Sequence, residues 1–414
     1  MDVTRRSFLK VGVTMVGAGA ILPPVFRKTL GALSAQRVHA APVDDGRVLV
    51  VVQMAGGNDG LNTVIPISDS RYYNARPRIA VPADQALSLD ADTGLHPVMT
   101  GMKGIWDSGN LAIVEGVEYP RPNFSHFTSM DIWQSADPNL KLTDGWVGRY
   151  FAAAGGSQPA PFLGLAVGSD LPKSMWTPTV AVPALPSIAQ YQFQGDPRVP
   201  ALTTPRTQAL STLCDAGRTD GAYGPLLSAT MRTATASIQT LTTATQQYKP
   251  AVTYPNKGLA NALLLVAQTI GANVGVKVCH VSIGGFDTHA TQATAQPRQL
   301  AELSDSLAAF HADLKAHQLD SKVLIMTWSE FGRRVNDNAS DGTDHGTAGP
   351  LFFLGTPVKG GRYGQRPDLG NLDNGNLRYT TDFRSVYATA IEGWLGAPSK
   401  AILGEKFELL PLLR

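Results

Sequence analysis

The chain contains apolar runs separated by segments with helical spacing of apolar residues. The run at residues 47–53 is apolar almost throughout, which predicts a strand buried on both faces, as in a parallel sheet. Further strands are predicted at residues 111–114, 276–283, 322–328 and 351–354. Helices are predicted at residues 97–108, 126–133, 259–267, 297–317 and 383–395. Because buried strands alternate with helices, we expect an α/β fold with a largely parallel sheet.

Residues 158–256 differ in character from the rest of the chain. They are rich in Pro, Ala, Thr and Gln and have few long apolar runs, and a helix is predicted at residues 226–248. They hold too many apolar residues for a disordered linker. We therefore interpret residues 158–256 as an inserted cap or subdomain of one α/β domain that spans residues 41–414.

The first forty residues have the order of a removable export signal. Arg5 and Arg6 precede a Phe-Leu pair, a mildly apolar run covers residues 11–21, and a small-residue cleavage pattern lies at residues 38–40. This order predicts a twin-arginine signal peptide, recognised by the Tat export machinery, and a periplasmic or extracellular protein. A membrane anchor is the alternative, but the run is too short and too rich in Gly, Ala and Thr to cross about 30 Å of hydrocarbon. No later run has the length of a stable membrane span.

Charge and cysteine content narrow the function classes. Removing the first forty residues leaves 29 of the 35 basic and 32 of the 33 acidic residues, a net charge of −3. A nucleic-acid partner is not expected, because its binding surface needs a basic excess. The two cysteines are too few for a disulfide scaffold, and Cys279 lies within a predicted strand, where a buried free thiol is expected.

Polar turns follow several of the predicted strands. They lie at residues 56–60, 122–127, 284–289, 329–333 and 342–347. Since the C-terminal ends of parallel strands meet at one edge of a sheet, we expect these turns to converge. Their carboxylates and imidazoles suit a divalent ion such as Zn, Mn or Fe, with Mg or Ca where oxygens dominate. The candidate metal ligands are Asp59, Asp287, His289, Glu330, Asp344 and His345.

For two of these carboxylates, a structural role explains the residue at least as well as metal binding does. Asp59 is equally well explained as the stabiliser of an Asn-Asp-Gly turn. Glu330 is somewhat better explained by an ion pair with Arg333 or Arg334. Both interpretations stay open at this point.

The remaining candidates favour a ligand role. Asp287 could cap the next segment, but His289 two residues later in a glycine-rich turn favours metal binding. In an extended segment, residues two apart point to the same side. Asp344 could be a turn residue, whereas His345 is flanked by glycine and small residues that allow another group to approach closely.

Ser125 is the candidate nucleophile. It precedes His126, but adjacent residues rarely form a nucleophile–base pair, and the chain has no G-x-S-x-G elbow. A metal ion would instead lower the pKa of the hydroxyl. Alternatively, Ser125 caps the helix at 126–133. The two roles are compatible, because a helix N-terminus also favours an anion.

Six motifs in chain order resemble a bacterial family of twin-arginine-exported proteins, the domain of unknown function 1501. The motifs are QMAGGNDGLNTVIP, YPRPNFSHFTSMDIW, GGFDTHATQ, WSEFGRR, GTDHGTAGP and TTDFRSVYATAIEGWLG. The family is similar to the alkaline phosphatase and sulfatase superfamily. The resemblance implies a three-layer α/β/α sandwich with a mostly parallel central sheet and metal ligands at the C-terminal ends of its strands.

The resemblance also implies roles for single positions. It assigns Asp59 (or Asn58) to the first-strand ligand, Ser125 to the nucleophile, Asp287 with His289 to an Asp…His pair, Glu330 to the position after the strand that delivers Asp-His, and Asp344 with His345 to the late His turn. The sequence departs from the superfamily in three places. Asp-x-His replaces Asp-x-x-x-His, Glu330-Phe331 replaces Asp-His, and the sulfatase Cys/Ser-x-Pro-x-Arg signature is absent.

Two hypotheses of function follow. In the first, the protein is an exported metal-dependent hydrolase of small anionic phosphate or sulfate esters, with a metal-activated Ser125 as nucleophile. In the second, it has kept the fold without turnover and serves as a binding or assembly partner at the cell envelope. The departures from the superfamily pattern favour the second hypothesis.

Overall fold

The computed structural model describes residues 45–154, 162–188, 203–216 and 237–414, together with positions 190, 199 and 201. The predicted signal peptide lies outside the described residues. Within the described part of the chain, no helix combines the length and the apolarity that a membrane crossing needs.

A nine-stranded, mostly parallel sheet forms the centre of the molecule. Its strand order is β11-β5-β10-β9-β1-β8-β6-β7, and β12 pairs with β5. The strands are β1 (Val48–Met54), β5 (Leu111–Glu118), β6 (Gly164–Val167), β7 (Ala184–Leu185), β8 (Val278–Ile283), β9 (Val323–Trp328), β10 (Gly349–Leu354), β11 (Gly361–Gly364) and β12 (Thr381–Asp382). Only β10 runs against its neighbours β5 and β9 among these pairs. The predicted α/β class with a largely parallel sheet is confirmed.

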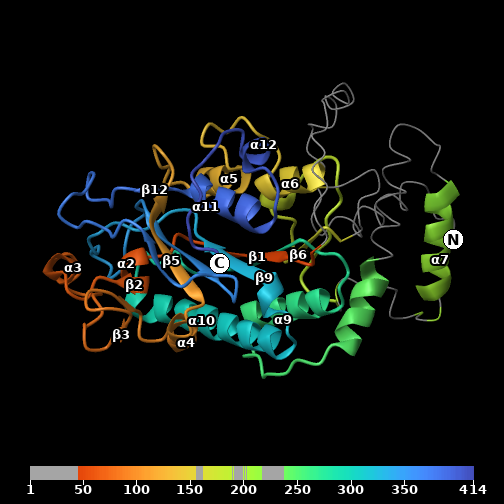
Figure 1. Cartoon of the computed structure of the whole chain (residues 1–414), viewed down its shortest axis with the longest axis horizontal. Helices are drawn as coiled ribbons and strands as arrows, with labels where there is room; N and C mark the ends of the chain where they lie inside the picture. The colour runs from red at the N-terminus through yellow and green to blue at the C-terminus, as the bar shows by residue number, and fades with distance from the viewer. Residues whose placement is uncertain are drawn as a thin grey trace.

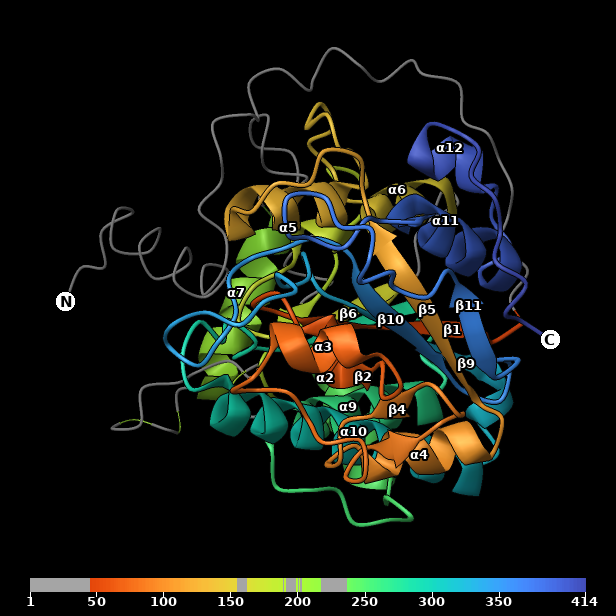
Figure 2. The same cartoon turned by 90° about the vertical axis from the view of Figure 1, so that its left-hand side faces the viewer.

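Helices cover both faces of this sheet, so the molecule has three layers (Figures 1 and 2). One face carries α4 (Thr100–Asp107), α9 (Gly258–Gly271) and α10 (Gln292–Ala316). The other carries α5 (His126–Ser135), α6 (Trp146–Ala154), α11 (Phe383–Ala388), which continues as a π-helix at Thr389–Trp394, and α12 (Ser399–Leu403).

The apolar sequence of β1 explains this arrangement. Successive side chains of a strand point to opposite faces. Val48, Val50 and Val52 accordingly lie in the core with α4, α9 and α10. Leu49 and Val51 lie in the core with α5, α6 and α11. A strand that serves two cores needs apolar residues on both of its faces, which is why the run at 48–52 is unbroken.

Smaller elements complete the described chain. They are α2 (Gly60–Thr63), α3 (Ser70–Ala75), α7 (Thr203–Ala216), the 3-10 turns Lys173–Met175 and Asp320–Lys322, a helix at 237–247, and the three-stranded sheet of β2 (Val64–Ile65), β4 (Gly94–Leu95) and β3 (Leu87–Ser88). Cys279 is a buried free thiol, as predicted from its place in a strand.

The stretch at 158–256 contributes to the main sheet. β6 pairs in parallel with β8, and β7 pairs with β6, so these strands extend the sheet beyond β8. At least this part of the stretch therefore belongs to the central layer and not to a separate cap. Short strands of four and two residues give little periodic signal in the sequence. Part of the helix predicted at 226–248 lies outside the described residues, and 237–247 is helical.

Helix α10 begins earlier than its pattern predicts. The prediction started it at Pro297, because the apolar residues with helical spacing begin at Leu300. In the structure it starts at Gln292, and Pro297 lies inside it. The additional turn contains the buried polar residues Gln292 and Gln296, which hydrogen-bond to neighbouring loops.

Candidate metal centre

The predicted polar turns gather at one edge of the central sheet. Strands β1, β8 and β9 are parallel, so the turns that follow them leave the sheet at the same edge. Strand β10 runs antiparallel to both β9 and β5. The turn before β10 and the turn after β5 therefore reach that edge too. Segments more than 200 residues apart in sequence are brought together by topology alone.

Three side chains from three of these turns form the centre of the cluster. His126, Asp287 and His345 each offer one ligand atom, and these atoms lie within 4.8 Å of one another. His345 Nε2 lies 3.1 Å from Asp287 Oδ1, and His126 Nε2 lies 3.4 Å from Asp287 Oδ2. His289 joins them, with its Nε2 at 2.9 Å from His345 Nε2 and 3.1 Å from Asp287 Oδ1.

These spacings fit the ligand set of a single divalent ion. Two atoms that each lie about 2.1 Å from a zinc ion and subtend a right angle are about 3.0 Å apart, and at a tetrahedral angle about 3.4 Å. Imidazole nitrogen and carboxylate oxygen are ligands that zinc, manganese and iron accept. The donor atoms and their separations are therefore ones that a divalent ion could bind.

The outer nitrogens of two histidines are held by fixed acceptors. His345 Nδ1 lies 2.8 Å from the carbonyl oxygen of Phe124, and His126 Nδ1 lies 2.8 Å from Glu330 Oε1. A carbonyl or carboxylate oxygen accepts, so Nδ1 carries the proton and Nε2 keeps a lone pair directed at the cluster. Such partners orient histidine ligands in metal proteins.

Arg333 connects the loops that carry the cluster. Its buried guanidinium donates to Asp287 Oδ1 at 2.7 Å and to the carbonyl oxygens of Gly57 at 2.7 Å, Phe286 at 3.0 Å and Thr343 at 2.9 Å. Burial by itself would raise the pKa of Asp287, but the neighbouring groups, first among them the hydrogen-bonded Arg333, outweigh it and lower that pKa to about 2. Asp287 is therefore ionised at neutral pH and available to a cation.

Two glycines let the loop that carries His345 pack tightly against the backbone of Arg333 and His289. A Cβ atom on Gly346 would lie 2.3 Å from the Arg333 carbonyl carbon, and one on Gly342 would lie 2.3 Å from the His289 carbonyl carbon. Arg333 and His345 pair as an isolated β-bridge. Burial lowers the pKa of His345, so its imidazole is neutral at pH 7, as a metal ligand requires.

Two of the predicted ligands lie behind the cluster. Glu330 is fully buried, and its Oε1 accepts from the Gly56 backbone N–H at 2.8 Å as well as facing His126. Its partner is thus His126, not Arg333 or Arg334. Asp344 Oδ1 lies 3.4 Å from His289 Nδ1, and hydrogen bonding to Asn338 lowers the Asp344 pKa. Both carboxylates are placed to orient a histidine.

Asp59 is the one predicted ligand that the structure does not bring to the cluster. Its carboxylate is buried, forms an ion pair with Arg76, caps α2 through the Leu61 N–H and accepts from Gln292. Both oxygens are occupied by protein donors, which accounts for the residue without an ion. The turn-residue interpretation agrees with this placement.

Ser125 lies at the start of α5, between Phe124 and His126. It is exposed, and as the N-cap residue it makes no side-chain capping hydrogen bond. The capping role considered for its hydroxyl is therefore not seen. Its neighbours on both sides contact the cluster, through the Phe124 carbonyl and the His126 imidazole. His126 was not among the ligands predicted from the sequence, although an imidazole in the polar turn beside Ser125 was a usable signal.

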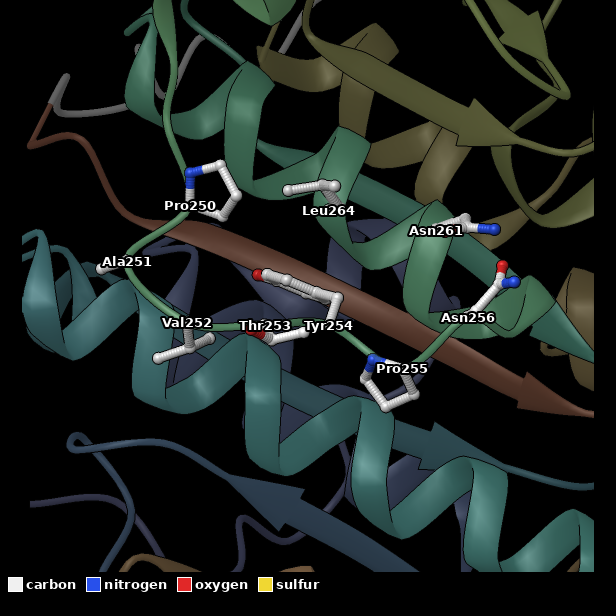
Figure 3. Close-up of a pocket in the computed structure, with 9 residues that line it drawn as sticks. All are labelled: Pro250, Ala251, Val252, Thr253, Tyr254, Pro255, Asn256, Asn261 and Leu264. Atoms are coloured by element: carbon white, nitrogen blue, oxygen red, sulfur yellow. The ribbon is translucent and has the colours of Figure 1, made fainter.

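A hollow of about 550 Å³ on the described part of the chain shares no residue with the cluster. It is lined by Pro250, Ala251, Val252, Thr253, Tyr254, Pro255, Asn256, Asn261 and Leu264 (Figure 3). It has no carboxylate or imidazole in its lining, and the Tyr254 hydroxyl donates to the buried Asp313 at 2.9 Å. This hollow lacks the groups that the proposed chemistry needs.

Comparisons with known proteins give one family and several distant structures. A model of the family described as "Protein of unknown function (DUF1501)" matches residues 114–391. No curated protein matches the sequence.

Three solved structures show the range of structural likeness. The PsFucS1 sulfatase from Pseudoalteromonas sp. has a TM-score of 0.40 and 12% identity, covering 99% of this chain and 75% of that one. The C-terminal periplasmic domain of EcEptC from Escherichia coli, in complex with Zn, has a TM-score of 0.34 and 13% identity, covering 77% of each chain. Alkaline phosphatase from the Antarctic bacterium TAB5 has a TM-score of 0.30 and 11% identity, covering 78% of this chain and 95% of that one.

Proposed function

The chain belongs to the DUF1501 family, as its motifs predicted, and we propose that it is an exported metal-dependent hydrolase of phosphate or sulfate esters. One observation carries the proposal. The Nε2 atoms of His126, His289 and His345 converge on the ionised carboxylate of Asp287. For His126 and His345, the Nδ1 atoms are held by Glu330 and by the Phe124 carbonyl.

This geometry assigns a ligand or an orienting role to each residue of the cluster. His126, Asp287 and His345 are the proposed inner ligands, with His289 beside them, and Glu330 and Asp344 orient His126 and His289. A divalent ion bound there would supply positive charge that lowers the pKa of a nearby hydroxyl and neutralises the oxygens of an anionic ester.

Ser125 is the proposed nucleophile. Attack by its Oγ forms a bond to phosphorus or sulfur and breaks the ester bond to the alcohol, which leaves with the proton that the hydroxyl gives up. Water then cleaves the serine ester and restores the hydroxyl. The N–H groups of the first turn of α5 point towards its N-terminal end, where they favour an anionic group next to Ser125.

The location of the protein is also part of the proposal. The signal peptide proposed at residues 1–40 directs the folded domain through the Tat pathway to the periplasm or the exterior. A small anionic ester in that compartment would be the substrate.

The test uses the natively exported protein. Its metal content is determined by elemental analysis, and its hydrolysis of an aryl phosphate and an aryl sulfate is followed with added Zn²⁺ or Mn²⁺. We expect bound metal and turnover of one ester class, lost in Ser125→Ala. Ser108→Ala is the control, because Ser108 is an exposed serine that lies before β5, at the opposite edge of the sheet.

Two results would change the assignment. Bound metal with no turnover of either ester would favour the non-catalytic binding or assembly partner. Turnover that persists in Ser125→Ala would remove Ser125 from the mechanism while leaving the metal centre in place.

A further inference from the structure

Gln292 lies at the centre of a buried network beneath the metal centre. It is in the first turn of α10 and is fully buried. Its Oε1 accepts from the Thr288 hydroxyl at 3.0 Å and from the Thr343 hydroxyl at 2.6 Å. Its Nε2 donates to Asp59 Oδ2 and, at 3.1 Å, to Gln296 Oε1. A side-chain amide offers two lone pairs and two N–H groups, so its full capacity is used.

Asp59 fixes which way this amide points. An ionised carboxylate only accepts hydrogen bonds, so the NH₂ group of Gln292 must face it. The carbonyl oxygen is thereby directed at the two threonines. Asp59 is itself held by the buried Arg76, which also donates to the backbone carbonyls of Arg334 and Val335. The amide is thus anchored to a rigid ion pair.

The two threonines belong to the two loops that carry most of the proposed ligands. Thr288 stands between Asp287 and His289, and Thr343 directly precedes Asp344 and His345. Both threonines are buried, and the Thr343 backbone N–H donates to the Thr288 carbonyl oxygen at 3.1 Å. One acceptor atom, Gln292 Oε1, therefore fixes side chains in both loops.

We infer that Gln292 is a positioning residue that sets the separation of the Asp287–His289 and Asp344–His345 loops, and through it the fit of the metal centre. The inference rests on the metal binding in the proposed function and does not depend on the ester chemistry. It also gives Asp59 its role, as the fixed anion that orients Gln292. Partners behind metal ligands typically change metal affinity 10- to 100-fold when they are removed.

The test compares two glutamines on the same helix. Gln292→Met keeps the approximate length of the side chain but leaves both threonine hydroxyls without their acceptor. Gln296→Met is the matched control, because Gln296 is equally buried one turn later and donates to Asn58, Asp59 and Thr63 but to neither ligand loop. It removes one acceptor of the Gln292 NH₂ group, but it leaves Asp59 to orient that amide and leaves both threonine contacts in place. The Zn²⁺ dissociation constant of each natively exported protein is measured by chelator competition, and the Tm of each metal-free form is recorded.

We expect Gln292→Met to bind Zn²⁺ at least about 10-fold more weakly than wild type, with Gln296→Met close to wild type. Both variants lose buried hydrogen bonds, so both should lower the metal-free Tm. Equal Zn²⁺ affinity in the two variants would overturn the inference, because the role of Gln292 would then be structural only.

A second pair of variants keeps the test decisive if Gln292→Met does not fold. Thr288→Val and Thr343→Val each remove one donor to Gln292 with little change in volume, and combined they should weaken Zn²⁺ binding to the same extent. Unchanged affinity in the double variant would also overturn the inference. Failure of the wild-type protein to bind Zn²⁺ or Mn²⁺ would instead reject the proposed metal centre itself, which distinguishes the two claims.

Discussion

Replacing Glu330 tests how strongly the residue that orients the proposed ligand His126 controls metal binding. Its Oε1 accepts from both the Gly56 N–H and His126 Nδ1. In Glu330→Gln, an amide oxygen can occupy the same place and accept both bonds, with its NH₂ facing Ser329 Oγ, which lies 3.4 Å from Oε2. Only the charge is lost. In Glu330→Leu, both N–H groups lose their acceptor.

The magnitudes follow from these contacts. Hydrogen bonds to a charged group contribute about 1.5–3 kcal/mol and neutral ones about 0.5–1.5 kcal/mol, so Glu330→Gln should cost about 1 kcal/mol. That difference is about a fivefold loss of Zn²⁺ affinity. Leaving a buried donor unpaired costs about 1–3 kcal/mol, or about 5- to 150-fold. The part of this cost that comes from His126 falls on metal binding. The half-buried His126 can turn towards water in the metal-free protein but not when it holds an ion.

The assay is chelator competition for Zn²⁺ with wild type, Glu330→Gln and Glu330→Leu, with Glu115→Gln as control. Glu115 is also a buried carboxylate, but it pairs with Arg362 on β11, away from the cluster. We expect affinity to fall in the order wild type, Gln, Leu, with the control unchanged. Leucine at position 330 with wild-type affinity would refute the reasoning, since His126 would then need no partner to bind the ion.

Three further predictions address ligand, export and pH. His345→Ala should remove most bound metal in elemental analysis while the thermal melt of the metal-free protein changes little, because a large core does not depend on an ion; equal metal content would exclude His345 as a ligand. Changing Arg5 and Arg6 together to lysine should leave precursor in the cytoplasm, and normal processing would contradict the predicted signal. Burial raises the pKa of Glu118 well above its ordinary value, so the folded state keeps a proton that the unfolded chain loses above about pH 4.3. The free energy of unfolding of wild type relative to Glu118→Gln should therefore fall between pH 5 and pH 8 in urea titrations, and a constant difference would show that Glu118 does not hold its proton.

The sequence determined the layers of the fold and the meeting of the polar turns. The unbroken apolar run at residues 48–52 predicts a strand between two cores, and β1 lies there. Once several such strands are parallel, their C-terminal ends must share an edge. That rule brings the turn of Asp287 and His289 to this edge, whereas His345 reaches it because β10, the strand after its turn, is antiparallel to β9.

Only the tertiary structure decided what each polar residue of those turns contacts. Asp59 and Asp287 both follow buried strands, yet Asp59 faces the buried Arg76 while Asp287 faces three histidines. Glu330 meets His126 across 204 residues of sequence. Hydrogen bonds act over about 3 Å, and the packing of whole elements decides which donors come within that distance of a carboxylate. Local sequence therefore identifies residues able to bind a metal ion, whereas the assembled fold decides which carboxylate faces histidines, as Asp287 does, and which is held by Arg76 and Gln292, as Asp59 is.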